Sequence, residues 1–408
     1  MMRLLMIATG YLPYLFSENL CNAKLVFALQ EAGIDVDVIS KVDEGPAYEN
    51  EWKEPWLPLK RSSYEIHYPL GSSIQRAADV AYSGWVMGNH YEAGIRWARR
   101  AYEQALKLMD VHHYDALLTR SPTDISHVVG MKLKENTGIK WLANWNDPAN
   151  PIWPEPYKHS YTNRVQLRKE RMTARLLSKA DINTFPSETL REHFSTFFPF
   201  LRTKHTEVIP HVGLSEQLFK RKATPPKSDI LRMCHSGNLS KERNPELTFK
   251  AMKELIDNGQ GQFRLDIMGH TNSYTELLID KYQLRQHVNL IGSYSYIEAI
   301  DKMQDYDVLV LLEARLEKGI FFASKFTDYA QIGRPIFSIS PKNGFASQMT
   351  ERFGGGICAD NTNSQDIKKS LKIVMSAWMQ NQLGKYTSNE LYKQFSPNVV
   401  VKKYLQMI

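Results

Sequence analysis

Short apolar runs alternate with amphipathic segments through the first half of the chain. Continuous apolar runs of this length are typical of strands buried on both faces. Residues 19–32 carry an inner apolar face that includes Leu25 and Leu29, and Gly33 follows as a helix stop. The predicted strands are residues 3–8, 34–40, 115–119, 139–145, 180–185 and 208–212. This alternation predicts a parallel sheet flanked by helices.

Two stretches of the first half are interpreted differently. Residues 43–75 are rich in Pro, Trp, Tyr and Ser and are predicted to be a long irregular insertion. Residues 76–109 mix small and apolar residues with arginines and are predicted to form one helix.

The strand–helix alternation starts again after residues 220–229, a charged segment with two prolines that is predicted to be a linker. Strands are predicted at residues 230–235, 263–268, 288–291, 307–312 and 335–339. Helices are predicted at residues 246–258, 273–282 and 295–303, and from Ser324 onwards. Two successive α/β sheets predict two Rossmann-like domains that face each other across a cleft.

The totals agree with two globular domains. A chain of 408 residues is too long for one ordinary core, and an apolar content of 43% is that of a folded protein. The sequence has no apolar run long enough to span a bilayer, and residues 1–8 are better interpreted as a first strand than as a signal peptide. The three cysteines lie far apart, which predicts reduced thiols and a cytoplasmic protein.

The net charge of +7 favours anionic partners: nucleic acid, anionic lipid or phosphorylated substrates. Nucleic acid is the weakest of these, because the chain has no RNP-like signature, helix-turn-helix pattern or zinc finger. The basic segment 164–179 is either a solvated helix face or a surface for peripheral contact with an anionic membrane. Two Asp-x-Asp pairs, at 35/37 and 305/307, are interpreted as chance occurrences rather than a metal site.

The most informative stretch is residues 306–340. A buried strand is followed by a polar loop at 313–319 and by a helix that starts at Ser324 and stops at Gly333. Ser324 is predicted to be the N-cap, and Lys325 adds a positive charge where free backbone amides already favour an anion. Asp328 could accept hydrogen bonds from a ribose diol. The alternative is an ordinary capped helix with a solvated Lys and Asp.

Residues 324–336, SKFTDYAQIGRPI, resemble the serine-lysine, acidic-tyrosine, glycine-lysine/arginine-proline segment of nucleotide-sugar glycosyltransferases. These are the two-domain GT-B enzymes of the large retaining family four. The resemblance implies an acceptor domain, a donor domain and a last helix that crosses back to the first domain. The predicted boundaries are 1–222, 223–385 and 386–408.

The resemblance also implies donor contacts in the second domain. The loop at 236–245 resembles the family's phosphate-binding loop, in which Gly237 lets the backbone approach and Lys241 and Arg243 neutralise the diphosphate. Asn238 stands where the family has an arginine, and Ile320 stands where it has a glutamate. The complete predicted donor set is Gly237, Lys241, Arg243, Gly292, Glu317, Gly319, Ile320, Phe321, Ser324, Lys325 and Asp328.

Candidate catalytic residues lie at strand ends of the first domain: Glu18, Arg120 and Asp147. Arg120 matches a position where the family often has His and, since it cannot act as a base, would orient or stabilise charge. Asp147 either polarises an acceptor hydroxyl or caps a strand end. Trp141, Trp145 and neighbouring aromatic residues either stack on acceptor sugars or are buried.

The sequence therefore predicts a glycosyltransferase that moves a sugar from a nucleotide diphosphate sugar to a glycan or lipid-linked acceptor, with retention and in surface polysaccharide assembly. Neither a metal nor a cofactor is expected, since the nucleotide sugar is a substrate. Two alternatives remain open: a nucleotide-sugar epimerase of the same fold, and a catalytically silent sugar-binding subunit.

Overall fold

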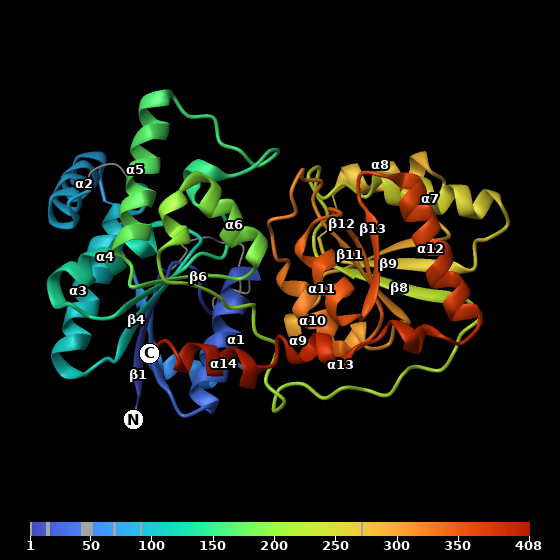
Figure 1. The fold of residues 1–408 in the computed structure, drawn as a ribbon, viewed down its shortest axis with the longest axis horizontal. Coiled ribbons are helices and arrows are strands. Elements are labelled where there is room, and N and C mark those ends of the chain that lie inside the picture. Colours follow the sequence, from blue (N-terminus) through green and yellow to red (C-terminus); the bar gives the residue numbers. More distant parts are fainter. Residues whose placement is uncertain (1, 14–16, 42–51, 68–70, 90–91, 271) are drawn as a thin grey trace. The chain divides into compact units, whose positions relative to one another are not determined.

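The computed structural model describes residues 2–13, 17–41, 52–67, 71–89, 92–270 and 272–408 (Figure 1). The chain divides into two compact units. Unit 1 comprises Met1–Ser215 and Pro397–Ile408, and unit 2 comprises Glu216–Ser396. Both are α/β units built on a parallel sheet, as the sequence predicts.

Unit 1 is organised around a seven-stranded sheet with the strand order β3-β2-β1-β4-β5-β6-β7. Every recorded pairing in it is parallel. The strands are β1 (Arg3–Ala8), β2 (Asp35–Lys41), β3 (Ser63–Ile66), β4 (Ala116–Arg120), β5 (Trp141–Asn144), β6 (Ile182–Phe185) and β7 (Thr206–Val208). Leu4, Leu5, Met6 and Ile7 of β1 are fully buried, which explains the continuous apolar run at the start of the chain.

The helices of unit 1 are α1 (Ser17–Glu31), α2 (Ser73–Met87), α3 (Ile95–Val111), α4 (Ile125–Thr137), α5 (Asn163–Lys179), α6 (Glu188–Phe197) and α14 (Pro397–Leu405). Short 3₁₀ turns occur at Leu57–Ser62, Asn150–Ile152 and Pro199–Arg202. Residues 76–109 therefore form parts of two helices rather than one. Gly88 is left-handed, with φ 64°, and closes α2.

The prediction of an irregular insertion at 43–75 is also wrong in part. Its residues 43–51 and 68–70 lie outside the described residues. The part between them contains a 3₁₀ turn and the edge strand β3, which pairs in parallel with β2 from Val38↔Ser63 onwards. This edge strand has only four residues, all half-buried, so its alternation is too short to be recognised in the sequence.

Unit 2 has a six-stranded parallel sheet with the order β10-β9-β8-β11-β12-β13. The strands are β8 (Leu231–Ser236), β9 (Phe263–Met268), β10 (Val288–Gly292), β11 (Val308–Leu312), β12 (Ile336–Ser340) and β13 (Gly356–Asp360). The helices are α7 (Glu246–Asp257), α8 (Ser273–Lys281), α9 (Tyr296–Met303), α10 (Ser324–Ile332), α11 (Phe345–Phe353), α12 (Ser364–Met379) and α13 (Asn389–Lys393), and a 3₁₀ turn lies at Leu383–Tyr386. Phe249, Met252, Ile367, Leu371 and Trp378 from α7 and α12 pack on one face of the sheet.

The division into units differs from the predicted boundaries at 222 and 386. Arg221 donates to the Gln331 carbonyl at 2.8 Å, and Lys222 pairs with Asp301 at 2.8 Å, so both belong to unit 2. Near the end of the chain, Phe395 is fully buried among Phe322, Phe326 and Phe345 and also belongs to unit 2.

The last helix, α14, belongs to unit 1, where it packs on α1. Lys403 donates to the Val208 carbonyl at 2.8 Å, and Tyr404 is 1% exposed. The chain thus completes its first α/β unit with its final helix (Figure 1).

Candidate active site

In unit 2, the ends of β8 and β11 meet the start of α10, which is where parallel sheets collect their ligands. Gly237 follows β8 with φ +131°. A Cβ atom at this position would lie 1.9 Å from Nζ of Lys325, in the first turn of α10. Only glycine therefore leaves room for the ammonium group to lie directly over the backbone.

The charges around Gly237 are not neutralised by one another. Partial burial lowers the pKa of Lys325 to about 7, helped by Arg243 and opposed by Glu313. Burial raises the pKa of Glu313, directly after β11, to about 7, against the effect of Arg243 and Lys325. Among the described residues, none forms an ion pair with Lys325, Arg243 or Glu313. Because Lys325 is partly buried and has no ion-pair partner among the described residues, this end of the sheet is suited to an anion.

A histidine beneath this group was not predicted. His235 is fully buried on β8, and its Nδ1 lies 2.9 Å from the carbonyl oxygen of Val310. This contact fixes Nδ1 as the protonated nitrogen and leaves Nε2 as an acceptor. Within the described part of the chain Nε2 has no hydrogen-bond partner. Burial, and then Lys325, hold the pKa of His235 well below its usual range, so the ring is neutral.

The predicted cap and hydroxyl acceptor differ in detail from the structure. Ala323, not Ser324, is the N-cap of α10, and it makes no side-chain capping bond. Ser324 is the first helical residue, so the prediction that it is the cap is wrong by one position. Asp328 lies on α10 with 7% exposure and accepts a hydrogen bond of 2.8 Å from the hydroxyl of Tyr296. Its carboxylate does accept from a hydroxyl, and the structure supplies one from α9.

The remaining predicted donor residues are spread along loops. Lys241, Arg243, Gly292 and Glu317 are exposed. Gly319 is buried against Gly344, whose Cα would lie 2.5 Å from an added Cβ, and Ile320 is 2% exposed. Phe321 is half-buried. Gly319 and Ile320 therefore hold the loop in place, and the side chain that replaces the expected glutamate is part of the core.

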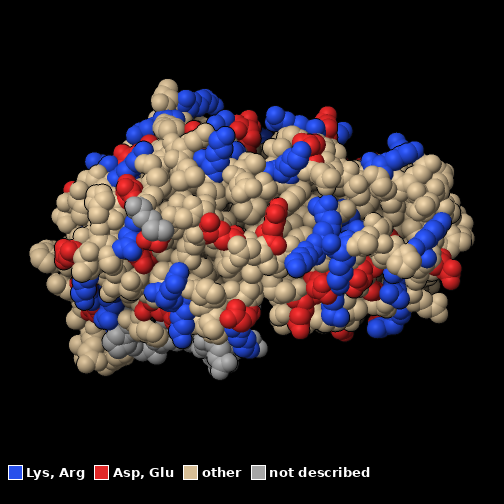
Figure 2. Space-filling model, turned by 90° about the horizontal axis from the view of Figure 1, so that it is seen from below, with Lys and Arg blue, Asp and Glu red and all other residues tan. Residues whose placement is uncertain are grey.

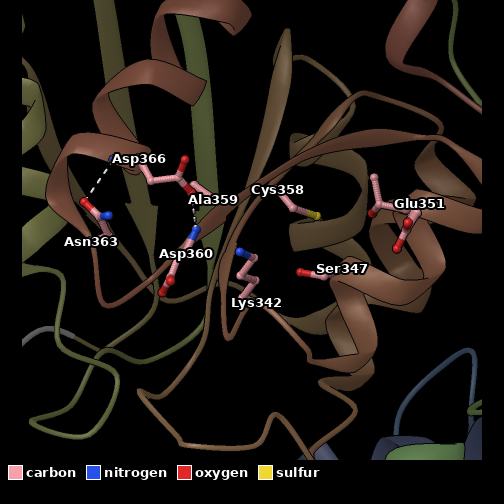
Figure 3. A pocket seen from close by; sticks show the side chains of 9 residues that line it. Lys342, Ser347, Glu351, Cys358, Ala359, Asp360, Asn363 and Asp366 are labelled. Carbon is pink, nitrogen blue, oxygen red and sulfur yellow. Dashed lines mark hydrogen bonds between the residues drawn. The ribbon is translucent and has the colours of Figure 1, made fainter.

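A polar pocket of about 470 Å³ lies elsewhere in unit 2, by the ends of β12 and β13 (Figure 3). None of the predicted donor residues lines it. Its acidic groups are used locally, since Asp366 accepts from the Asp360 amide at 2.8 Å and Asp360 accepts from the Thr362 amide at 2.9 Å. These bonds fix the turn between β13 and α12.

Unit 1 has its own charged cluster, at the ends of β1, β4 and β5. Arg120 ends β4 with 4% exposure and donates to the Asn22 side chain and to the Tyr404 hydroxyl, the latter at 3.3 Å. A guanidinium nitrogen of Arg120 lies 3.5 Å from Glu18. Asn146, just beyond β5, donates to the same carboxyl group. The cluster joins two predicted residues, Glu18 and Arg120, from distant parts of the chain.

The third predicted residue of unit 1, Asp147, is next to this cluster. Burial raises the pKa of Glu18 to about 8, against the effect of Arg120, and the charge of Asp147 adds to the rise. Burial lowers the pKa of His211 to about 4, while Glu18 and Asp147 oppose this. His211 and Tyr404 were not predicted to be site residues, although His211 lies within the predicted strand at 208–212.

The aromatic residues near β5 are mostly structural. Trp141 and Trp145 are fully buried, and their indole nitrogens donate to Thr119 and Asn183 at 2.8 and 3.0 Å. They cannot stack on a sugar. Trp153 and Tyr157, in the segment after β5, are half-buried and make an edge contact.

In each Asp-x-Asp pair, the second aspartate is already bonded within its own unit. Asp37 accepts from the Tyr114 hydroxyl at 2.7 Å, and Asp307 binds Arg232 at 3.0 Å. Across the described residues, no group of three or more His, Cys, Asp or Glu side chains is arranged to hold a metal ion.

Comparisons with known proteins agree with this architecture. Residues 216–390 match the family model described as "Glycosyl transferases group 1". No curated protein matches the chain by sequence. Sucrose-phosphate synthase from Thermosynechococcus elongatus is similar in structure, with a TM-score of 0.70 at 15% identity over 100% of this chain and 98% of that one. HepE from Anabaena, in complex with UDP and glucose, gives a TM-score of 0.66 at 14% identity over 100% and 99% of the two chains.

A third solved structure, the catalytic domain of starch synthase IV from Arabidopsis thaliana bound to ADP and acarbose, gives a TM-score of 0.65 at 11% identity. It covers 100% of this chain and 98% of that one. The chain therefore has the GT-B fold, and the match to the group 1 glycosyl transferase model lies in its second unit.

Proposed function

We propose that this protein is a metal-independent, retaining glycosyltransferase that uses a nucleotide diphosphate sugar. The observation that carries the proposal is a pair of cations that lack an ion-pair partner among the described residues: Lys325 in the first turn of α10 and Arg243 in the loop after β8. A diphosphate supplies the two negative charges that this site lacks. Because the charge on the leaving diphosphate grows as the glycosidic bond breaks, the same cations would stabilise the transition state.

Each donor group has a partner in unit 2 under this proposal. The diphosphate approaches the backbone at Gly237, and the free amides of α10 add their dipole to the charge of Lys325. The ribose diol bonds to Asp328 and replaces the hydroxyl of Tyr296. The family match over this unit and the nucleotides bound by the similar HepE and starch synthase IV structures support the assignment.

The acceptor would bind at the cluster of unit 1. Glu18, Arg120 and Asp147 would orient and polarise the attacking hydroxyl. In the retaining reaction, the acceptor oxygen forms its bond to the anomeric carbon on the face from which the diphosphate leaves. A diphosphate oxygen takes the hydroxyl proton, so the protein need not supply a base.

The acceptor class and cellular role follow the same proposal: a glycan or lipid-linked acceptor in surface polysaccharide assembly, on the cytoplasmic side of a membrane. No described helix combines the length and apolarity needed to cross a bilayer. The proposal does not include nucleic acid among the partners. On the face seen in Figure 2, basic and acidic side chains are interspersed rather than gathered into one basic surface.

A nucleotide screen tests the donor site. UDP, GDP, ADP, CMP and dTDP are added separately, with and without EDTA, and thermal unfolding is followed. We expect one nucleotide to raise the midpoint through linkage, with no effect of EDTA. Arg243→Ala should abolish the shift, while Lys369→Ala, which removes an exposed lysine of α12, should keep it.

Product analysis then separates the reaction classes. The nucleotide sugar that matches the screen is incubated with and without a glycan acceptor, and the products are analysed by NMR. A new glycoside with the donor's anomeric configuration supports the proposal. An epimer formed without acceptor would establish the epimerase instead, and binding without any product would establish a silent sugar-binding subunit.

A further inference from the structure

Helix α2 of unit 1 has its apolar side chains on the outside. Ile74 is 82% exposed, Tyr82 is 53% exposed and Trp85 is 72% exposed. The spacing of Ile74 and Trp85, with Ala78 and Ala81 between them, places them along one stripe of the helix. Figure 1 shows α2 at the outer side of unit 1, next to α3 and α4. Large exposed apolar faces of this kind mark binding surfaces.

The inner face of α2 is polar, the reverse of an ordinary surface helix. Asp79 binds Arg96 at 2.5 Å, Arg99 at 3.0 Å and Arg100 at 3.6 Å, all on α3. The hydroxyl of Ser83, also on the inner face, accepts from Arg99 at 3.0 Å. The helix is thus held to its unit by ion pairs and hydrogen bonds, and Met87 at its end is its one buried large apolar side chain.

Helix α2 is stabilised at both ends, and the aromatic side chains on its exposed face are held in place. Ser72 and Gln75 form a complete capping box at the start of α2, and Gly88 closes its end. Tyr82 and Trp85 stack with ring centroids 6.1 Å apart, and the guanidinium of Arg99 lies 5.1 Å from the Tyr82 ring. An aromatic pair held in this way presents a rigid apolar surface at low entropic cost.

The surroundings of this face are basic. Arg76 of α2 is exposed, and Arg96, Arg99 and Arg100 lie behind the helix. The carboxylates bonded to these arginines are Asp79 and Glu103. Partial burial would raise the pKa of Asp79, yet the hydrogen bonds from Arg96 and Arg99 hold it below its usual value. Four arginines thus outnumber two carboxylates around one apolar stripe.

We propose that the outer face of α2 docks on an anionic lipid bilayer. Trp and Tyr favour the boundary between headgroups and acyl chains, Ile74 can enter the acyl region, and the exposed Arg76 can bind a lipid phosphate. A second copy of the chain on this face would bring one basic surface against another, which like-charge repulsion disfavours. A helix of 15 residues lying flat offers about 22 Å of such a face.

The biological role of this docking rests on the proposed function, because a lipid-linked acceptor is located at a membrane. Binding to vesicles, in contrast, does not depend on catalysis. The α2 face is distinct from α5, whose outer residues Arg164 and Arg171 are exposed and basic but include only one large apolar residue, Leu167, at 47% exposure. Only charge would attract α5 to a bilayer, whereas α2 combines positive charge with apolar side chains that can insert into the bilayer.

Flotation with vesicles tests the proposal. The full chain is mixed with vesicles of phosphatidylcholine, with or without phosphatidylglycerol, at low and high salt. We expect flotation with the anionic vesicles only, weakened by salt. Ile74→Gln combined with Trp85→Gln should weaken binding at least about tenfold, and Arg76→Gln by roughly fivefold. Leu277→Gln is the matched control, because Leu277 of α8 is 66% exposed but lies in unit 2.

Three results would overturn the proposal: no flotation of the wild type, equal flotation of the double variant, or binding to neutral vesicles that equals binding to anionic ones. A dimer in size-exclusion chromatography that the double variant converts to a monomer would assign the face to a second copy instead. Nucleotide-induced thermal shifts of each variant serve as the fold control. Flotation without any nucleotide shift would leave this inference standing and remove the proposed function.

Discussion

The two units each place a charged cluster at the carboxyl edge of a parallel sheet, and the two clusters differ in how their charges are balanced. In unit 1, Arg120 is held by Glu18, Asn22 and Tyr404. In unit 2, Lys325 and Glu313 interact through space without an ion pair, and the pKa values of both lie near 7. The side chains of the unit 1 cluster bond to one another, whereas the cations of the unit 2 cluster have no ion-pair partner among the described residues.

This difference suggests that the two clusters have different roles: the unit 1 cluster orients the acceptor, and the unit 2 cluster binds the nucleotide. A satisfied network such as that around Arg120 keeps its side chains in fixed orientations, which suits the positioning of a neutral acceptor. A partly buried cation without an ion-pair partner, such as Lys325, gains most from an incoming diphosphate, because burial has already removed part of its hydration and the ligand compensates for that loss. The comparison predicts that changes in unit 2 will affect nucleotide binding and that changes in unit 1 will affect turnover.

The largest effect is expected from Lys325→Ala. Loss of one charge-assisted contact of this kind costs about 1.5–3 kcal/mol, so nucleotide affinity should fall about 10- to 100-fold. Isothermal titration with the nucleotide found by the screen measures it, and Lys369→Ala should bind like the wild type. Unchanged affinity in Lys325→Ala would place the diphosphate elsewhere.

Gly237→Ala should act through the same ammonium group. The new Cβ would lie 1.9 Å from Nζ of Lys325, and the left-handed φ of +131° would be strained by any side chain. We expect about tenfold weaker nucleotide binding and a lower unfolding midpoint. Gly384→Ala is the matched control in unit 2, because a Cβ there meets nothing within 4 Å. If both variants bind equally well, the close approach at Gly237 has no role.

Nucleotide affinity should also depend on pH. As pH rises through about 7, Lys325 loses its positive charge and Glu313 gains a negative one, and both changes disfavour a diphosphate. Affinity should therefore be highest below pH 7 and fall above it, by up to about tenfold per pH unit for each group. Titrations across this range measure it. Glu313→Gln should flatten the profile, and a profile that rises with pH would contradict the assignment.

The smallest effect is expected in unit 1. Tyr404→Phe removes the hydroxyl that accepts from Arg120 at 3.3 Å, a bond worth about 0.5–1.5 kcal/mol. Turnover should fall about 2- to 10-fold, with nucleotide affinity unchanged. Tyr386→Phe, a change at a half-buried tyrosine of unit 2, should alter neither. A change in nucleotide affinity in Tyr404→Phe would break the division of roles between the units.

Much of the fold could be predicted because its signals are local. Apolar runs, helix periods and stops such as Gly333 extend over only a few residues, and they predicted the α10 segment and the strands of both sheets other than β3 and β13. Edge strand β3 was missed because four half-buried residues carry no clear period. The cap of α10 was misplaced by one residue, since the observed cap is Ala323, which cannot form a side-chain capping bond, whereas the adjacent Ser324 has the side chain typical of a cap.

The site was predicted less completely, because its chemistry depends on long-range neighbours. Lys325 was among the predicted donor residues, with a solvated charge as the alternative, but its partial burial and its position over Gly237 could not be inferred from the local sequence. His235 lies one residue before the end of β8 and Glu313 directly follows β11, positions that could have indicated a role for both. Tyr404 could not be found in this way, since 284 residues separate it from Arg120.

The position of Tyr404 has a consequence for synthesis of the chain. A ribosome releases residues 1–215 first and the whole of unit 2 next, so unit 1 must wait for α14 while its neighbour folds. Until then the α14-facing surface of α1 lacks its cover and Arg120 lacks its last partner. A nascent chain arrested before residue 397 would hold a complete second unit and an unfinished first one.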